Sequence, residues 1–287
     1  MNEQATVARN LGVQVDELIT AVPGEWKFDH EVAANFDAHV RRSVPFYDQV
    51  QHMIVDMSEW FVHDGMSIYD LGSATGETIA LLQERHANKR DIRFIGVDNS
   101  LPMIEKARQK CRQETAQFLY QNITDIAEFS NTSLIVSVYT LQFIPLAERR
   151  RILERIHSDL SEGGALIIVE KVRGETSLFE DIWVELYWDM KQQQGLNSDQ
   201  VIAKARSLRG VLMPLTVSEN VRLLHESGFG SVDIFMKSYN FTGFIAVKME
   251  KGADVRHLSG TERPVLHQAL GGADKKNDTA TRRRRES

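Results

Sequence analysis

The residues best suited to chemistry lie in one short stretch, residues 67–76, with the sequence SIYDLGSATG. Its apolar start predicts a strand, and the helical pattern that begins at Glu77 predicts that the chain turns directly into a helix. A glycine-rich turn between a strand and a helix presents free backbone N–H groups and a positive dipole end to a ligand. Four small residues in the turn let that ligand lie against the backbone, namely Gly72, Ser73, Ala74 and Gly76.

A second apolar run, residues 92–97, ends in Asp98 and Asn99. An acidic residue at the end of a second strand, about 20 residues beyond a glycine-rich turn, is placed to accept hydrogen bonds from a ribose. The two stretches together predict a site for a ligand that contains a nucleoside.

The spacing of the glycines separates two kinds of nucleotide site. A dinucleotide fold has the pattern G-x-G-x-x-G, because a pyrophosphate sits on the helix end. Here Asp70 precedes Gly72, and the next glycine is Gly76. A carboxylate at this place would repel a pyrophosphate but could hold a cationic amino-acid group, a combination that resembles the class I S-adenosylmethionine (SAM) methyltransferases. The alternative is a turn without a ligand, in which the glycines only ease packing; the spacing of Asp98 favours SAM.

The elements that must position these residues alternate between strand and helix patterns. Residues 63–249 predict an α/β domain with a doubly wound, mostly parallel sheet of seven strands. Residues 232–239 and 241–247 are separated by a single residue and predict a terminal antiparallel pair. Residues 175–212 interrupt the rhythm and predict a helical insertion over the substrate end of the sheet.

Residues 1–62 precede the first core strand and predict a helical lid. Within residues 1–20 the apolar residues predict a short helix. A longer helix is expected from an N-cap at Asp29 to about Ser43, where Pro45 would stop it. At the other end of the chain, residues 250–287 have the composition of a disordered basic tail.

Composition places the chain among ordinary globular proteins. It has 287 residues, 42% hydrophobic and 26% charged, and a formal net charge of −6, which gives no strong nucleic-acid signal. Cys111 is the only cysteine, so an internal disulfide is impossible, and the nine histidines include no spaced pair that predicts a metal site. The chain shows no signal peptide and no membrane-length apolar run, and we expect a cytoplasmic protein.

From residue 24 to residue 248 the chain also resembles the carboxy-SAM synthase family. The resemblance rests on Trp26–Asp29, Arg42–Tyr47, Tyr69–Gly72, Asp98–Ile104, Thr140–Phe143 and Gly163–Leu166. It implies a methyltransferase fold that carboxylates the methyl group of SAM, with prephenate as carboxyl donor, for the modification of a tRNA wobble uridine. It also implies SAM contacts from Tyr47, Gly72, Ser73, Ala74, Asp98 and Asn99.

Three positions depart from that family. The chain has Asn122 and Ile123 where the family has Asp-Ile, although an amide oxygen can still bond the adenine amino group. It has Val138 in place of an asparagine, and Arg206 stands in Lys-Ala-Arg-Ser where the family has Lys-Arg-Ser around its carboxylate-binding arginine. Because a carboxylate in a dry pocket needs compensating donors, we expect SAM to bind well and carboxylation to be slow or absent.

Several reactions therefore stay open for a SAM-dependent enzyme with a small-molecule substrate. The simplest is methyl transfer, with Tyr139, Gln142, Tyr187 and Arg206 on the acceptor side and Glu170 as a base or as an ion-pair partner of Lys171. The alternatives are carboxy-SAM synthesis, intramolecular cyclisation or aminocarboxypropyl transfer that releases methylthioadenosine, and non-catalytic SAM binding in a complex. A homodimer is also expected.

Overall fold

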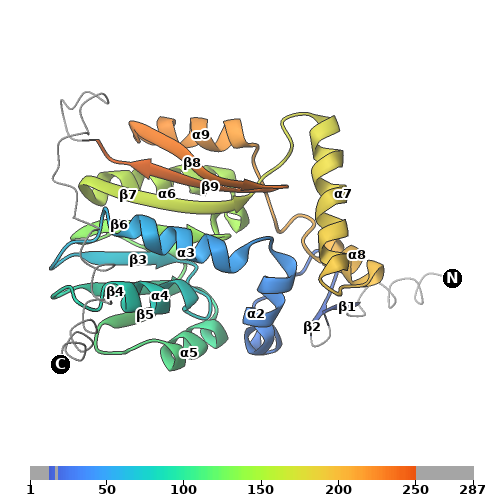
Figure 1. Cartoon of the computed structure of the whole chain (residues 1–287), viewed down its shortest axis with the longest axis horizontal. Coiled ribbons are helices and arrows are strands. Elements are labelled where there is room, and N and C mark those ends of the chain that lie inside the picture. Colours follow the sequence, from blue (N-terminus) through green and yellow to red (C-terminus); the bar gives the residue numbers. More distant parts are fainter. Residues whose placement is uncertain (1–12, 17–18, 250–287) are drawn as a thin grey trace, which may run out of the picture. The chain divides into compact units, whose positions relative to one another are not determined.

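A mostly parallel sheet forms the centre of the computed structural model, which describes residues 13–16 and 19–249, all within one compact unit. The seven strands run in the order β5-β4-β3-β6-β7-β9-β8 (Figure 1). Their bounds are Ser67–Leu71 (β3), Arg93–Asp98 (β4), Ala116–Tyr120 (β5), Thr132–Val138 (β6), Leu160–Lys171 (β7), Ser231–Ser238 (β8) and Phe241–Val247 (β9).

The strand directions confirm the fold predicted from the sequence. Strands β3 to β7 pair in parallel, whereas β9 runs antiparallel to both β7 and β8. The parallel strands are continuous apolar runs because helices cover both of their faces. The fold is therefore a doubly wound α/β sheet with a terminal antiparallel hairpin.

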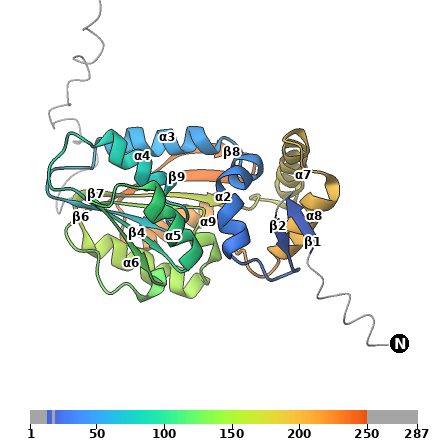
Figure 2. The same ribbon diagram turned by 90° about the horizontal axis from the view of Figure 1, so that it is seen from below.

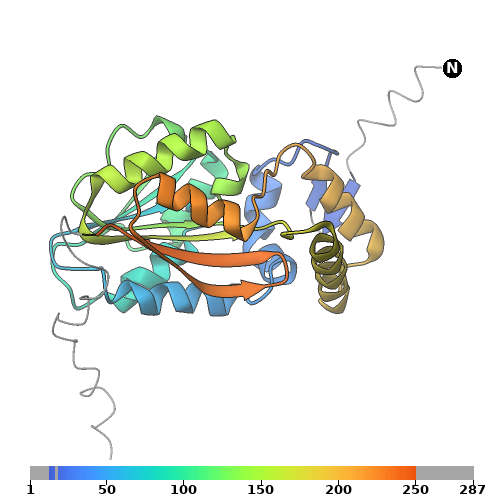
Figure 3. The ribbon, with the colours of Figure 1, turned by 90° about the horizontal axis from the view of Figure 1, so that it is seen from above.

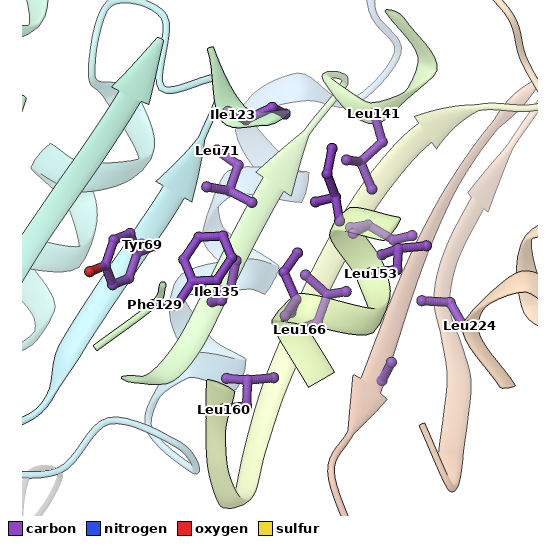
Figure 4. Close-up of a cluster of buried hydrophobic side chains, with 14 of the residues drawn as sticks. Tyr69, Leu71, Ile123, Phe129, Ile135, Leu141, Leu153, Leu160, Leu166 and Leu224 are labelled. Carbon is purple, nitrogen blue, oxygen red and sulfur yellow. The ribbon is translucent and has the colours of Figure 1, made fainter. Parts of the chain in front are cut away.

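Helices on the two faces bury separate apolar clusters. On one face α3 (Tyr47–Ser58), α4 (Glu77–Arg85) and α5 (Leu101–Lys110) cover Ile68, Phe94 and Leu134. On the other face lie α6 (Leu146–Asp159) and α9 (Val217–Glu226) (Figures 2 and 3). There Leu153 and Leu224 pack with Leu166 and other strand side chains (Figure 4). This packing fixes the strand ends at which the site is built.

Three further helices lie beyond the carboxyl ends of the parallel strands. They are α2 (His30–Ser43), α7 (Ser177–Gln193) and α8 (Ser198–Ser207). The predicted start of α2 is confirmed, because the Asp29 side chain accepts a hydrogen bond from Val32 N at 3.0 Å. Helix α2 also ends at Ser43, as Pro45 predicts. Helices α7 and α8 form the predicted insertion.

The expected helix near the N-terminus is wrong where the structure describes this segment. Residues Val13–Asp16 (β1) and Ile19–Ala21 (β2) form an antiparallel hairpin instead. Val15 and Ile19 are buried beside Ala203 of α8. Val13 pairs with Ala21 and Gln14 with Thr20, so these residues bond across a hairpin rather than along a helix.

Strand β7 begins at Leu160, and the glycine pair Gly163 and Gly164 lies within it. Gly163 has φ +76, and a Cβ on Gly164 would approach Ser133 O to 3.0 Å. The glycines thus allow an irregular, close pairing with β6.

Two short 3₁₀ helices complete the described elements, η1 (Ile123–Asp125) and η2 (Leu141–Phe143). Among the residues that the structure describes, no helix is long and apolar enough to cross a membrane. The predicted tail, residues 250–287, lies outside them.

Candidate functional site

A cavity of about 370 Å³ opens at the carboxyl ends of the parallel strands. Each of these strands contributes the residue at its end or just beyond it, namely Gly72, Asp98, Asn122, Val138 and Lys171. Helices α2, α3, α7 and α8 supply the opposite walls. The cavity therefore occupies the place where open α/β sheets bind their ligands.

The glycine-rich turn forms one wall and requires its first glycine. Gly72 has φ +77, and a Cβ there would lie 2.1 Å from Thr140 Oγ1. Ser73 and Ala74 also line the cavity, whereas Gly76, with φ +80, serves as the N-cap of α4 and does not. Backbone can approach a ligand here as the sequence predicts.

Asp98 is held in place by the backbone around it. Its Oδ2 accepts a hydrogen bond from Ala74 N at 3.0 Å, and its Oδ1 accepts one from Ser100 N at 2.8 Å. Burial raises the pKa of Asp98 above its ordinary value despite these donors. The carboxylate and its neighbour Asn99 line the cavity, in a geometry suited to ribose hydroxyls.

Asp70 lies behind the turn, outside the cavity wall. Its side chain is buried, and Oδ2 has no hydrogen-bond partner among the described residues. Burial and the nearby Asp98 raise the pKa of Asp70 to about 7. The expected contact between this carboxylate and a ligand is therefore not direct.

Asn122 and Ile123 line the cavity beyond β5, as expected. Asn122 Oδ1 accepts a hydrogen bond from Thr124 N at 3.1 Å, which fixes the amide and leaves it a further lone pair. Ile123 is buried and gives a flat apolar surface. Together they could hold an adenine ring.

A group of aromatic rings also lines the cavity. Tyr47 stacks near Tyr139 with ring centroids 6.4 Å apart, and Phe241 lies 5.7 Å from Tyr139 and 5.2 Å from Tyr187. Burial raises the pKa of all three tyrosines, so their hydroxyls stay protonated. Tyr187 Oη donates to Ser43 O at 2.8 Å, whereas Tyr139 Oη has no partner among the described residues. Tyr139 is therefore a donor available to a ligand.

Gln142 was expected on the acceptor side, but its side chain is already engaged. Nε2 donates to Tyr139 O at 3.0 Å, and Oε1 accepts from Lys171 N at 2.8 Å. Gln142 therefore holds the strand ends together, although it does contact the cavity.

Neither role considered for Glu170 matches its geometry. Its two oxygens accept hydrogen bonds from Leu141 N at 3.0 Å and Gln142 N at 2.7 Å. The side chain is buried outside the cavity, and burial raises its pKa to about 8. Glu170 fixes the start of η2 rather than facing a substrate or pairing with Lys171.

The basic residues of the cavity differ from the one singled out in the sequence. Arg206 is exposed on α8 and does not line the cavity, whereas Lys204, two residues earlier, does. Lys171 lines the cavity as well, with Nζ 5.0 Å from the centroid of the Tyr187 ring. Sequence reasoning missed both lysines, although the place of Lys171 at a strand end was a usable signal.

Burial makes both lysines costly to keep charged. Burial lowers the pKa of Lys171, and it lowers that of Lys204 further. The nearby Lys191, whose pKa burial lowers to about 7, adds to the repulsion felt by Lys204. An anionic ligand in this part of the cavity would restore their charge.

Comparisons with known proteins agree with this geometry. Residues 68–164 match the model of a methyltransferase domain. The chain is 37% identical over 227 residues to the carboxy-S-adenosyl-L-methionine synthase of Staphylococcus epidermidis, covering 79% of this chain and 98% of the relative. It is 37% identical over 232 residues to the enzyme of that name from Methylococcus capsulatus, covering 78% and 94%.

Solved structures agree on the fold. A putative SAM-dependent methyltransferase from Methanococcus maripaludis superposes with a TM-score of 0.51 at 22% identity, covering 80% of this chain and 97% of the other. Human N-acetylserotonin methyltransferase, solved with SAM, gives a TM-score of 0.53 at 15% identity, covering 77% and 56%. At this identity the likeness concerns the fold alone.

Proposed function

The chain belongs to the carboxy-SAM synthase family and is a SAM-dependent enzyme, and from this premise we propose that it transfers a carboxyl group from a small carboxylate to SAM. The observation that carries the proposal is the presence of Lys171 and Lys204 in the same cavity as Asp98. A site for the nucleoside and a site for an anion then share one enclosed space.

The departures from the family at Val138 and Arg206 bear directly on this proposal. Carboxylation was expected to be slow because Val138 cannot donate a hydrogen bond and Arg206 is shifted. That expectation did not include Lys171 and Lys204, which line the cavity and support the proposal as cations. A charged hydrogen bond to a carboxylate contributes about 1.5–3 kcal/mol, comparable to what the missing groups would have given.

The roles of the residues follow from the same arrangement. We assign the ribose to Asp98, the adenine to Asn122 and Ile123, and the aminocarboxypropyl group to the turn at Gly72. The sulfonium would then meet the ring of Tyr47, and the second substrate would lie between Tyr139, Lys171 and Lys204.

Incubation with SAM alone and then with SAM and prephenate, followed by mass spectrometry of the nucleoside products, tests the proposal. We expect carboxy-SAM only when prephenate is present. Lys204→Met should lower its formation by about tenfold or more, while Arg206→Met on the same helix should leave it within about twofold.

Other products would contradict the proposal in distinguishable ways. Methylthioadenosine from SAM alone would indicate cyclisation, and S-adenosylhomocysteine formed only with an added acceptor would indicate methyl transfer. Carboxylation that depends on Arg206 and not on Lys204 would overturn the assignment of the cation.

We further propose that the enzyme is a cytoplasmic homodimer. The exposed side of α7 carries large apolar residues, Leu178, Phe179, Ile182 and Leu186. Such a continuous apolar helix face is unusual on a monomer, and a second copy of the same face is its simplest cover. Cell fractionation with an antibody to the chain tests the compartment.

A further inference from the structure

Three polar side chains form a buried array in the wall of the cavity that α2 supplies. His39 Nδ1 lies 2.6 Å from Asp16 Oδ2, and His39 Nε2 lies 3.4 Å from Ser43 Oγ. Only about 5% of His39 and of Ser43 is exposed, and Asp16 is almost wholly buried. Both His39 and Ser43 line the cavity.

The array does more than attach the N-terminal hairpin to α2. Arg42 Nη2 already donates to Asp16 Oδ1 at 2.6 Å, which by itself fastens the two elements. His39 adds a different property, because Asp16 occupies one ring nitrogen and thereby fixes the tautomer. Among the described residues, the other nitrogen, Nε2, has only the 3.4 Å contact to Ser43 Oγ, and it can therefore exchange a proton with a ligand.

The other polar groups on the cavity are poorly suited to accept a proton. The three tyrosine hydroxyls stay protonated because burial raises their pKa. The Gln142 amide is bonded to backbone at both ends. Asp98 and Glu77 line the cavity, but Asp98 is assigned to the ribose, and Glu77 pairs with Arg41 at 2.9 Å and with Lys110 at 2.7 Å. Lys171 and Lys204 are assigned to the anionic substrate, which keeps them charged.

We propose that His39 Nε2 carries the proton that is transferred during the reaction, with Asp16 as its positioning residue. The inference rests on the proposed function, since carboxylation must remove one proton from the SAM methyl carbon. With the ribose assigned to Asp98 and the sulfonium to Tyr47, we place the methyl group in the part of the cavity that His39, Lys171 and Lys204 line.

The proposed carboxyl transfer needs no reactant other than SAM and the carboxyl donor. The donor's bond to its carboxyl carbon breaks, the pair stays with the donor fragment, and carbon dioxide is released into the cavity. A C–H bond of the SAM methyl group breaks, its proton goes to His39 Nε2, and its pair forms the new bond to the carbon of carbon dioxide. The donor fragment, or the group that leaves it, then takes the proton from Nε2.

The charges around His39 suit a base that begins neutral. Burial lowers the pKa of His39, and Lys204 and Lys191 lower it further. Asp16 acts in the opposite direction and stabilises the imidazolium once it forms. Arg42 contacts the same carboxylate and offsets part of its charge. A neutral imidazole at physiological pH can therefore take a proton and return it.

A serine nucleophile is the other chemistry that an Asp-His-Ser array allows, and the fold disfavours it. Ser43 is the last residue of α2, where the helix dipole presents its negative end. An oxyanion formed beside Ser43 would be destabilised there. The array thus suits proton transfer rather than acyl transfer.

Deuterium incorporation into the SAM methyl group tests the proposal. The enzyme is incubated with SAM in D₂O near neutral pH, and the label is measured by mass spectrometry. We expect wild-type enzyme to catalyse the exchange and His39→Asn to lower its rate by about 100-fold or more. The asparagine keeps a donor near Asp16. His52→Asn, at an exposed position of α3, should exchange at the wild-type rate.

The outcomes separate this inference from the proposed function. Exchange that is lost in His39→Asn, with SAM affinity within about threefold of wild type, supports the inference even if prephenate gives no product. Wild-type exchange or carboxylation rates in His39→Asn would overturn it while leaving carboxy-SAM synthesis intact. If His39→Asn fails to bind SAM, His39→Ala with added imidazole decides: restored exchange supports the inference, and restored SAM binding without exchange overturns it.

Discussion

Gly72 is the residue of the turn that tolerates a side chain least. A Cβ there would lie 2.1 Å from Thr140 Oγ1, and its φ of +77 is strained for any other residue. We expect Gly72→Ala to lower SAM affinity at least tenfold, because relief of the clash moves the turn. Gly65→Ala is the matched control, since Gly65 has φ +78 and nothing within 4 Å of its Cβ.

Calorimetry and thermal unfolding of both variants test this expectation. The control should lose about 1 kcal/mol of stability from its backbone strain and keep its SAM affinity. Equal SAM affinities in Gly72→Ala and Gly65→Ala would mean that the turn does not contact the ligand.

Asp98 is the residue on which the nucleoside assignment depends. Its carboxylate lines the cavity and is held by Ala74 N and Ser100 N. We expect Asp98→Ala to weaken SAM binding by about 1–3 kcal/mol through lost ribose hydrogen bonds. Calorimetry should show no such loss for Asp125→Ala, an exposed acid outside the cavity. Unchanged affinity in Asp98→Ala would refute the ribose contact.

Asp70 should make the stability of the ligand-free enzyme depend on pH. Burial raises the pKa of Asp70 to about 7, so the folded state holds the proton more tightly than the unfolded state does. Stability contributed by the protonated form is therefore present at low pH and is lost as pH rises toward 7.

Urea unfolding at pH 5 and pH 8 measures this loss in wild type and in Asp70→Asn. In the variant the free energy of unfolding should fall less between the two pH values, because its amide does not titrate. Asp125→Asn should fall as wild type does. If the free energy of unfolding falls equally in wild type and in Asp70→Asn, Asp70 does not cause the pH dependence.

Helices α2 and α3 line the cavity in which we place the nucleoside. They contribute His39, Val40, Ser43 and Tyr47 to the cavity, and Tyr187 Oη of α7 donates to Ser43 O at 2.8 Å. Asp37 of α2 also accepts a hydrogen bond from Thr75 Oγ1 of the glycine-rich turn at 2.5 Å, so the predicted lid segment contacts both the turn and the insertion. A ligand in the cavity would add contacts to all three.

We expect hydrogen exchange of residues 25–50 to slow when SAM is added, because the ligand orders α2 and the start of α3. Mass spectrometry of peptides from this segment measures the effect, and peptides from α6 on the far face of the sheet serve as the internal reference. Equal exchange with and without SAM would show that the segment packs on the sheet but does not respond to the ligand.

At the scale of the whole molecule, the exposed apolar face of α7 is the surface that we propose a second copy covers. Leu178 on α7 is 64% exposed, and Ile182, one turn along, is 38% exposed. We expect a dimer by light scattering after gel filtration, and a monomer when both residues are changed to aspartate. Leu146→Asp, at an exposed leucine of α6, should leave the dimer intact. A monomeric wild type would contradict the proposal.

The sequence by itself determined the features that depend on neighbouring residues. Asp29 and Ser100 begin helices because their side chains accept backbone hydrogen bonds three residues ahead. Period and apolar content indicated the alternating strands and helices of a doubly wound sheet, and the glycine pattern with Asp98 indicated SAM. These rules use only residues that are close in the sequence, so they can be applied to a single sequence.

The tertiary structure decided which polar side chains reach the cavity. Along α8 successive residues turn by about 100°, so Lys204 faces the cavity while Arg206 faces solvent. Asp16 and His39 are 23 residues apart and meet only because a hairpin, not a helix, precedes α2. Contacts between distant segments depend on how whole elements pack, and no pattern within either segment records that packing.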